Sequence, residues 1–394
     1  MVMPKLTRSI GWKTYGLFGL GNIVGAGIYV LIGEVAAVAG TGLIWTFVVA
    51  GLVASLTVYS YGALASKYPR SAGASVYVLK SFNARTLSLI VGLVLAFSGI
   101  VSGGVLLNGF ANYAFELSGI PTTYFIVAAV LVLAAVTLRG IKESITLAVI
   151  ITLIEVTGLI LVSAAAFMSP SFMDNAMTAL STSLQPGILP IMAGSFLAFY
   201  AFIGFEDMVN VAEEVRNPSV NVKKAMYFAI IAAIALYTLV AVAALSVLSA
   251  SELGESKAPL AAVYKTATGY GFPLVTYIGL FAIVNGVIAQ IIMGSRVLYG
   301  LSSQKLLPAW FGVVGKKTHT PTNATLLIVV VMLAAALSLP LATLAGLTSL
   351  ALLVIFTIVH AACIKLRHQL NINPFFPSLG IALNLIVIAF QLIG

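Results

Sequence analysis

Residues 19–29, GLGNIVGAGIY, place four glycines in the middle of an apolar stretch. A second stretch of this kind, FYAFIGFE at residues 199–206, lies about 180 residues later and is again flanked by apolar sequence. Hydrophobic segments interrupted at corresponding places in two halves of a chain are typical of transporters, where they mark the binding site. Unwound backbone is tolerated at membrane depth only where protein or a water-filled cavity satisfies its polar groups. The two stretches therefore predict a buried site between two broken helices.

The composition is that of an integral membrane protein. Of the 394 residues, 61% are hydrophobic and 8% are charged, whereas a soluble domain carries about 25% charged residues. A membrane-spanning helix needs about 20 mainly apolar residues. We expect one all-α transmembrane domain over residues 1–394, because little sequence is left for a soluble domain. The sequence predicts eleven spans, at about 13–37, 41–65, 87–115, 122–138, 143–168, 186–209, 224–249, 272–301, 323–339, 341–363 and 375–393.

The net charge of +9 reflects membrane topology. With a cytoplasmic N-terminus, eighteen of the twenty Lys and Arg residues fall in cytoplasmic segments, and only Lys257 and Lys265 fall outside. The positive-inside rule predicts this asymmetry. We therefore expect a multi-pass protein of the cell membrane, either a plasma or an inner membrane, with the lipid bilayer and not nucleic acid as its partner. The sequence does not indicate the number of subunits.

The order of the spans predicts two inverted repeats, at about 11–168 and 186–365. Each repeat has five spans, and an odd number makes the second half enter the membrane from the opposite side. The two interruptions then lie in the first helix of each half, in spans one and six. The last span, 375–393, falls outside the repeats and is expected to be peripheral.

Six short motifs in this order resemble the amino acid–polyamine–organocation superfamily of transporters. The resemblance covers nearly the whole chain. It implies a leucine-transporter-like core of ten helices in two inverted repeats, with discontinuous helices 1 and 6. It also implies an amino-acid-like substrate that is moved by alternating access. Members usually have twelve spans, one more than predicted here. The motifs are Gly-Ala-Gly-Ile at 25–28, Tyr-Pro-Arg-Ser-Ala-Gly at 68–73, Arg-Gly-Ile-Lys-Glu-Ser at 139–144, Phe-Ile-Gly-Phe-Glu at 202–206, Glu-Glu-Val-Arg-Asn-Pro at 213–218 and Ser-Arg-Val-Leu-Tyr-Gly at 295–300.

Broken helices can bind an amino acid zwitterion with main-chain groups. A half-helix that begins near Gly27 presents free N–H groups and a positive dipole end to a carboxylate. Carbonyls freed at the two interruptions can accept hydrogen bonds from an ammonium group. Glycines let a ligand approach the backbone closely, although small residues also serve helix packing. The predicted substrate-binding residues are Ile23, Val24, Gly25, Ala26, Gly27, Tyr200, Ala201, Phe202 and Ile203.

Several residues near the second interruption are candidates for gating. The resemblance implies that an aromatic residue here closes the pocket, and Tyr200 or Phe202 can do so; packing is the alternative role of such rings. Glu206 matches an acidic position common in the family, and we expect it to cap the half-helix or to hold nearby backbone. Glu213 or Glu214 can pair with Arg70 or Arg296 when the inner path closes. A surface pair contributes at most about 1 kcal/mol, which suits a reversible latch; a solvated loop without such a role is the alternative.

Glu155 lies near the middle of the span at 143–168, with no basic residue within a helical turn. An ionisable residue at this depth is a functional candidate. In several relatives this position carries a lysine, whose ammonium replaces the sodium ion of other members of the fold. We hypothesise that Glu155 binds and releases a proton as the cavity opens and closes. The alternatives are a carboxylate that helps to hold a cation near the first interruption, and a protonated side chain hydrogen-bonded to the backbone.

Asn285 is the second candidate for ion coupling. It lies in the span at 272–301, close to where a coupling ion sits in related folds. Hydrogen bonding between helices explains most amides at this depth, so a structural role is the alternative.

The motifs of an intramembrane enzyme are missing from the sequence, which has no His-Glu-x-x-His, no Gly-x-Ser-x-Gly and no paired aspartates in its spans. Rings of charged pore residues, which a channel would carry, are not visible either. We expect a secondary active amino acid transporter without cofactor or metal, and not an enzyme. Proton symport is the first choice of mode and amino acid exchange the second. A small or neutral substrate is favoured, because no acidic side chain lies at either interruption itself.

Overall fold

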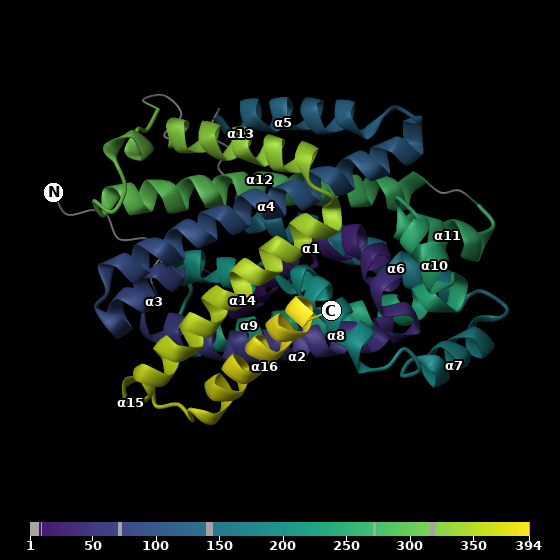
Figure 1. Ribbon diagram of the computed structural model, residues 1–394, viewed down its shortest axis with the longest axis horizontal. Coiled ribbons are helices and arrows are strands. Elements are labelled where there is room, and N and C mark those ends of the chain that lie inside the picture. The colour runs from purple at the N-terminus through teal and green to yellow at the C-terminus, as the bar shows by residue number, and fades with distance from the viewer. Residues whose placement is uncertain are drawn as a thin grey trace.

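The computed structural model describes residue 8 and residues 10–69, 73–138, 145–270, 273–315 and 320–393, apart from the side chains at 26, 145–147, 210, 211, 213, 214, 273, 274 and 391–393. Figure 1 shows a bundle of helices. These are α1 Trp12–Ala39, η1 Gly40–Gly42, α2 Leu43–Lys67, α3 Gly73–Phe82, α4 Arg85–Ser118, α5 Thr122–Leu138, α6 Ile145–Phe167, α7 Phe172–Thr182, α8 Ile188–Ala198, η2 Phe199–Phe202, η3 Phe205–Glu214, α9 Pro218–Val247, α10 Ala250–Glu255, α11 Pro259–Thr268, α12 Pro273–Ser303, η4 Ala309–Gly312, α13 Thr322–Ser338, α14 Leu341–Lys365, α15 Arg367–Leu370 and α16 Phe375–Ile393.

The predicted spans coincide with apolar helices. In the described part of the chain, seven helical stretches are long and apolar enough to cross a membrane, and the first of them, Gly27–Lys67, contains both the second half of α1 and α2. Three further apolar helices are shorter, at Thr122–Leu138, Thr322–Ser338 and Phe375–Phe390. A helix of 17 residues such as α5 is about 25 Å long at 1.5 Å per residue, slightly less than a hydrocarbon core of about 30 Å. The total of eleven spans stays a prediction.

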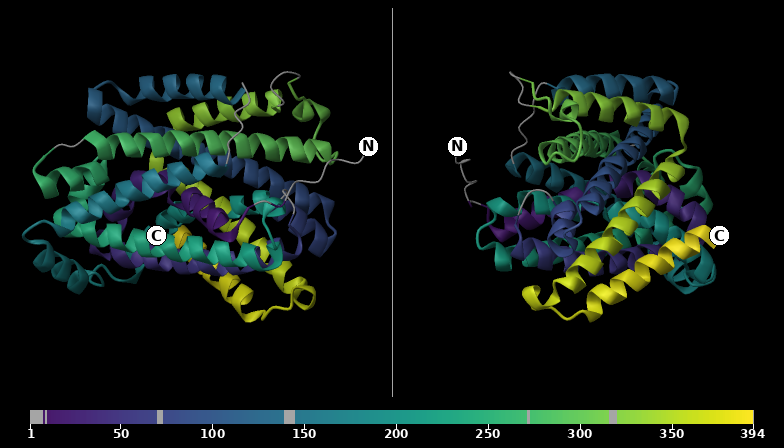
Figure 2. Two further views of the ribbon diagram at one scale, coloured as in Figure 1. Left: turned by 180° about the vertical axis from the view of Figure 1, so that it is seen from behind. Right: turned by 60° about the vertical axis from the view of Figure 1, so that its left-hand side comes forward.

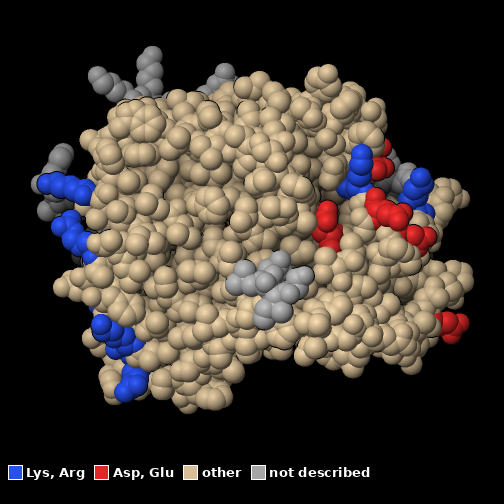
Figure 3. All heavy atoms as spheres, viewed as in Figure 1, with Lys and Arg blue, Asp and Glu red and all other residues tan. Residues whose placement is uncertain are grey.

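The outer surface of the bundle suits lipid. Leu131 of α5 is 64% exposed, and Val330 of α13 is 62% exposed. Large contiguous apolar surfaces are rare on proteins surrounded by water, but they match the hydrocarbon of a bilayer. Figure 3 shows a broad central band without charged side chains, with charged residues gathered toward the two ends.

The charges at the two ends differ in sign. Lys and Arg side chains gather at the end where α3 and α15 lie, and the acidic side chains in this view gather toward α7, α10 and α11 (Figures 1 and 3). Lys257 follows α10 and Lys265 lies in α11, whereas Lys80 and Arg367 belong to α3 and α15. The two basic residues predicted to lie outside are therefore at the opposite end from these two. The side on which the N-terminus lies stays a prediction.

Helices at matching positions of the two predicted halves pack against each other. The most extensive contacts join α4 with α12 and α2 with α9, and α1 contacts η2 and η3. These are the third, second and first helices of the two halves, as a pseudo-two-fold arrangement would produce. Inversion of the repeats stays a prediction. Helix α16 contacts α14, α2 and α8 and lies at the edge of the bundle (Figures 1 and 2).

Candidate functional site

Helix α1 is interrupted at Gly25, as the glycine-rich stretch predicts. The backbone angles of this residue, φ −24° and ψ −136°, lie outside the helical region, and helix continues on both sides. A Cβ atom built on Gly25 would meet no heavy atom within 4 Å. The interruption therefore opens onto free space, and the helix that restarts after it presents N–H groups without helical partners.

The second interruption follows α8 and η2. Ile203 is extended, with φ −64° and ψ 145°, and Gly204 has φ 121°. A positive φ of this size favours glycine. The Gly204 N–H donates to the Glu206 carboxylate over 2.9 Å. Glu206 thus binds the backbone at the start of η3. The helix dipole also stabilises a negative charge at this position.

The two interruptions lie against each other. A Cβ atom on Gly204 would overlap the carbonyl group of Asn22, and a Cβ atom on Gly27 would lie 2.9 Å from the Cα atom of Ala201. Both contacts are with backbone, which cannot move aside as a flexible side chain can. Glycine at these two positions therefore lets the two broken helices approach each other.

Tyr237 of α9 joins both interruptions through one hydroxyl group. Its Oη lies 2.7 Å from the carbonyl oxygen of Ile23 and 2.8 Å from that of Ala201, and it donates to both. Tyr237 is fully buried. Carbonyl groups that lose their helical partners at membrane depth need a replacement donor, and this hydroxyl supplies it to α1 and η2 at once.

Two hydrogen bonds tie the first half of α1 to η3 and the residues after it. The Tyr15 hydroxyl donates to the carbonyl oxygen of Met208 over 2.7 Å. The Arg216 N–H donates to the carbonyl oxygen of Ile10 over 2.9 Å. The half-helices on this side of the two interruptions are thus connected independently of Tyr237.

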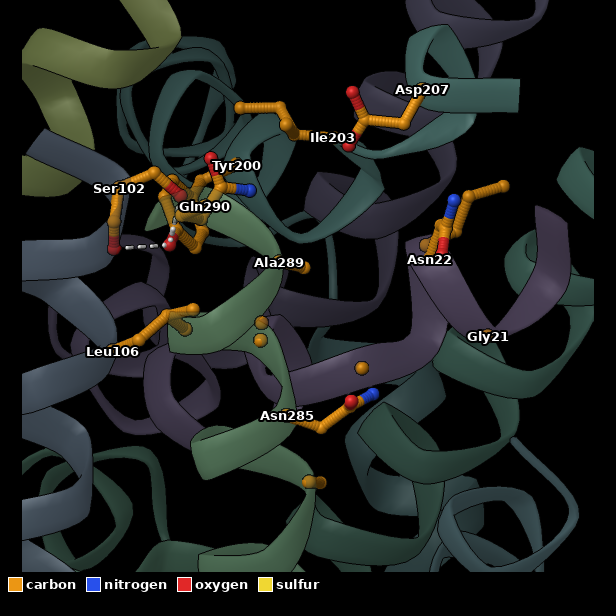
Figure 4. A pocket seen from close by; sticks show the side chains of 15 residues that line it. Gly21, Asn22, Ser102, Leu106, Tyr200, Ile203, Asp207, Asn285, Ala289 and Gln290 are labelled. Atoms are coloured by element: carbon orange, nitrogen blue, oxygen red, sulfur yellow. Dashed lines mark hydrogen bonds between the residues drawn. The ribbon is translucent and has the colours of Figure 1, made fainter. Parts of the chain in front are cut away.

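A cavity of about 60 Å³ lies at the two interruptions (Figure 4). One water molecule needs about 10–15 Å³ by this kind of measure, so the cavity has room for a small organic molecule. Its wall comes from α1, α4, η2, η3, α12 and the link between η2 and η3. The lining residues are Gly21, Asn22, Ile23, Gly25, Gly27, Ser102, Leu106, Tyr200, Ile203, Asp207, Ala282, Asn285, Gly286, Ala289 and Gln290.

The two aromatic candidates for the gate have different surroundings. Tyr200 lines the cavity, and its Oη lies 2.8 Å from the Oγ of Ser102 in α4, as Figure 4 marks. The Phe202 ring is fully buried, 5.0 Å from the Tyr237 ring and 6.5 Å from the Phe47 ring between centroids. Only Tyr200 is placed to close the cavity directly, and its gating role stays a prediction.

The structure brings most of the predicted binding residues to the cavity. Asn285 lines it as well, and Figure 4 shows its side chain pointing from α12 toward α1. Val24, Ala201 and Phe202 are buried beside the cavity without lining it. The side chain of Ala26 lies outside the described part of the structure. The predicted residues that line the cavity are Ile23, Gly25, Gly27, Tyr200, Ile203 and Asn285.

The predicted pair of Arg70 and Glu213 involves a residue and a side chain that the structure does not describe. Arg70 and the side chain of Glu213 lie outside the described residues, so their pairing stays a prediction.

Asp207 also lines the cavity, although the sequence did not predict it as a site residue. This residue directly follows Glu206 and is half-buried at the cavity wall, on the same side as Ile203 and Asn22 (Figure 4). An acidic side chain therefore borders the cavity, although none lies at either interruption itself. Ser102, Leu106 and Gln290 were missed as lining residues because nothing in the sequence shows which face of α4 or α12 points inward.

Glu155 lies apart from the cavity, in α6. It is 1% exposed, and neither carboxyl oxygen has a hydrogen-bond partner among the described residues. The Tyr29 hydroxyl donates to its main-chain carbonyl over 2.8 Å, and the carboxyl lies close enough to Tyr29 and Tyr237 to interact electrostatically with both. An unpaired buried carboxylate is costly, and a proton or a cation would lower this cost.

The model of the amino acid permease family matches residues 10–394 of this sequence. The chain belongs to the amino acid permease family. It is therefore a membrane-embedded amino acid transporter and not an enzyme.

Several curated proteins are similar to this permease over nearly its whole length. An uncharacterised transporter of Mycobacterium tuberculosis is 28% identical over 396 residues, which cover 99% of this chain and 88% of that protein. Cationic amino acid transporter 2, vacuolar, of Arabidopsis thaliana is 27% identical over 92% of this chain and 60% of its own length. Cationic amino acid transporter 4, vacuolar, of the same plant is 26% identical over 92% and 64%. The permease spans less than two thirds of either plant protein.

Replacing Gly204 by alanine tests the contact between the interruptions. We expect Gly204→Ala to lower the stability of the permease by at least about 1–3 kcal/mol, the cost of a strained backbone residue, because its Cβ also meets the Asn22 carbonyl. Thermal unfolding of the purified protein in detergent measures this effect. Gly300→Ala is the control, since a Cβ there meets nothing within 4 Å and alanine favours a helix. Equal melting temperatures for the two variants would contradict the proposed contact.

Replacing Tyr237 by phenylalanine removes the donor that the two carbonyls share. Each buried carbonyl left unsatisfied costs about 1–3 kcal/mol, so we expect Tyr237→Phe to lower the melting temperature of the permease clearly. Tyr277→Phe is the matched control, because Tyr277 is 57% exposed. If both variants melt at the temperature of the wild type, Tyr237 does not support the interruptions.

Proposed function

We propose that this permease carries a small neutral amino acid together with a proton by alternating access. The observation that carries the proposal is the cavity between the two interruptions, which Gly25, Gly27 and Ile203 line. N–H groups of the helix after Gly25 suit the substrate carboxylate, and carbonyls freed at the second interruption suit its ammonium group. The small volume of the cavity, about 60 Å³, favours a short side chain.

The arrangement of hydrogen bonds suits alternating access. In the cavity wall, Tyr200 is held to Ser102 of α4. Away from the wall, Tyr15 holds the first half of α1 to η3. Opening the protein at either place requires the loss of a few hydrogen bonds, each of which contributes about 0.5–1.5 kcal/mol. We propose that these two groups of contacts separate in turn.

Glu155 is the proposed proton carrier. Its carboxyl is buried without a hydrogen-bond partner among the described residues and lies near Tyr29 of α1 and Tyr237 of α9. A proton on this carboxyl removes the charge that burial penalises, and a change in the packing of α1 alters that burial. Asn285 lies in the cavity wall and is the proposed second residue for coupling.

A cationic amino acid is the second candidate substrate. The Asp207 carboxyl at the cavity wall favours it, and two plant relatives are named cationic amino acid transporters. Amino acid exchange remains the second candidate mode. We further propose a location in the cell membrane with a cytoplasmic N-terminus, although those plant relatives are named vacuolar.

Substrate binding and carrier behaviour can be tested on the purified permease. We expect small neutral amino acids to raise its melting temperature, because a ligand of the folded state stabilises it, by about 2.7 kcal/mol at 100 times Kd. A screen of the twenty amino acids at about pH 5 and about pH 8 measures this shift. Counterflow of the best ligand in proteoliposomes then separates a carrier, which saturates, from a channel. Flux that does not saturate contradicts the proposal.

Replacing Glu155 by glutamine tests proton coupling. We expect wild-type uptake of the substrate to be faster at low external pH, and Glu155→Gln to lower the ratio of the uptake rates at about pH 5 and about pH 8. Glu255→Gln, at an exposed site at the end of α10, is the matched control and should keep the wild-type ratio. Full pH dependence in Glu155→Gln would remove the proton role.

A further inference from the structure

Three carboxyl groups, of Glu155, Glu206 and Asp207, lie within the bundle, and no described Lys or Arg forms an ion pair with any of them. Glu206 is 9% exposed and binds the Gly204 N–H. Glu155 lies in α6 and does not line the cavity. Asp207 alone of the three borders the cavity, and its carboxyl forms no hydrogen bond with the described residues. A ligand in the cavity can therefore reach one carboxyl group.

The described neighbours of Asp207 in η3, α2 and the cavity wall are acidic or neutral. Glu206 precedes it on η3, and Tyr61 of α2 interacts electrostatically with both acidic residues. Asn22 and Asn285, which also line the cavity, are neutral amides.

Several other titratable groups on the elements that pack against η3 have contacts of their own. Tyr15 of α1 donates to Met208, and the Tyr77 ring of α3 packs on Tyr61 at 6.1 Å between centroids. On α9, Tyr237 donates to Ile23 and Ala201, and the Lys224 Nζ lies 4.0 Å from the Trp12 ring centroid. Lys223, also on α9, has its Cγ beside Gly62 of α2. No basic side chain of the described residues is thus seen to pair with Asp207, and a ligand in the cavity can supply the positive charge.

Charge balance then restricts the net charge that the cavity can hold beside Asp207. A carboxylate without compensation is costly at membrane depth. A zwitterion brings no net charge, so a cavity that holds a neutral amino acid keeps the charge of Asp207. A proton on Asp207 removes this charge. The ammonium or guanidinium group of a cationic side chain also balances it, through a charge-assisted hydrogen bond of about 2.7–2.9 Å.

We propose that Asp207 fixes the charge of the cargo, so that the permease carries a neutral amino acid with one proton more than a cationic amino acid. The inference rests on the proposed function and adds a residue that determines substrate charge. For a neutral substrate, the extra proton binds the Asp207 carboxyl from one solution and leaves into the other. For a cationic substrate, the carboxylate binds the side chain and carries no proton. Glu155 contributes equally to both cases.

The test compares two substrates of the same shape. L-norleucine and L-ornithine have side chains of equal length, and they differ in a terminal methyl or ammonium group. Proteoliposomes with a trapped pH indicator and labelled substrate give the number of protons carried with each molecule. We expect the number for norleucine to exceed that for ornithine by one in the wild type. We expect Asp207→Asn to abolish this difference.

Three further variants make the result specific. Asp207→Glu keeps the charge and should keep the difference between the two substrates. Glu155→Gln should lower both proton numbers equally and also keep the difference. Asp174→Asn, at an exposed site of α7, is the matched control and should behave as the wild type.

Equal proton numbers for the two substrates in the wild type overturn the inference. It is equally overturned if the difference persists in Asp207→Asn, or if alanine is transported but ornithine does not enter. If the permease transports none of alanine, ornithine and norleucine, the proposed function itself is overturned. The two failures are therefore distinguishable.

Discussion

Every N–H and C=O group of a membrane helix needs a partner, because lipid offers none. This constraint governs the site, since Gly25 and Gly204 each release backbone groups in the middle of the bundle. Some of the released groups are satisfied by specific neighbours. Glu206 accepts from the second interruption, and Tyr237 donates to both interruptions. These partners stabilise the two non-helical segments, and the cavity lies beside those segments.

Buried tyrosines connect the elements around the site. Tyr15, Tyr29, Tyr113 and Tyr200 each donate a hydroxyl hydrogen to a main-chain carbonyl of another element, as Tyr237 does. A phenol group has one hydrogen, little conformational freedom and no charge. A network built in this way positions backbone without bringing basic residues into the bundle. The acidic residues are therefore left without permanent counter-charges, which makes protons and cationic ligands their natural partners.

The positions of the helices and of both interruptions could be predicted from the sequence, because long apolar runs and glycines determine them locally. The side of each helix that faces the cavity could not. Ser102 and Gln290 lie on helices that are apolar on all faces, so no polar stripe distinguishes the inward face. Asp207 was missed because successive residues of a 3₁₀ helix point about 120° apart, and the neighbouring Glu206 binds backbone. Tyr237 resembles any aromatic residue of an apolar helix until the carbonyls beside it are known.

The single hydroxyl of Tyr237 has one hydrogen for two acceptors. At any instant it can be well aligned with only one of the carbonyls, so neither bond has the strength of an undivided one. When α1 and η2 move apart, the hydroxyl can follow one of them and give it a complete bond. The lost contact is thereby offset in part by the one that improves. The contact between α1 and η2 through Tyr237 is therefore easier to break than its two hydrogen bonds suggest.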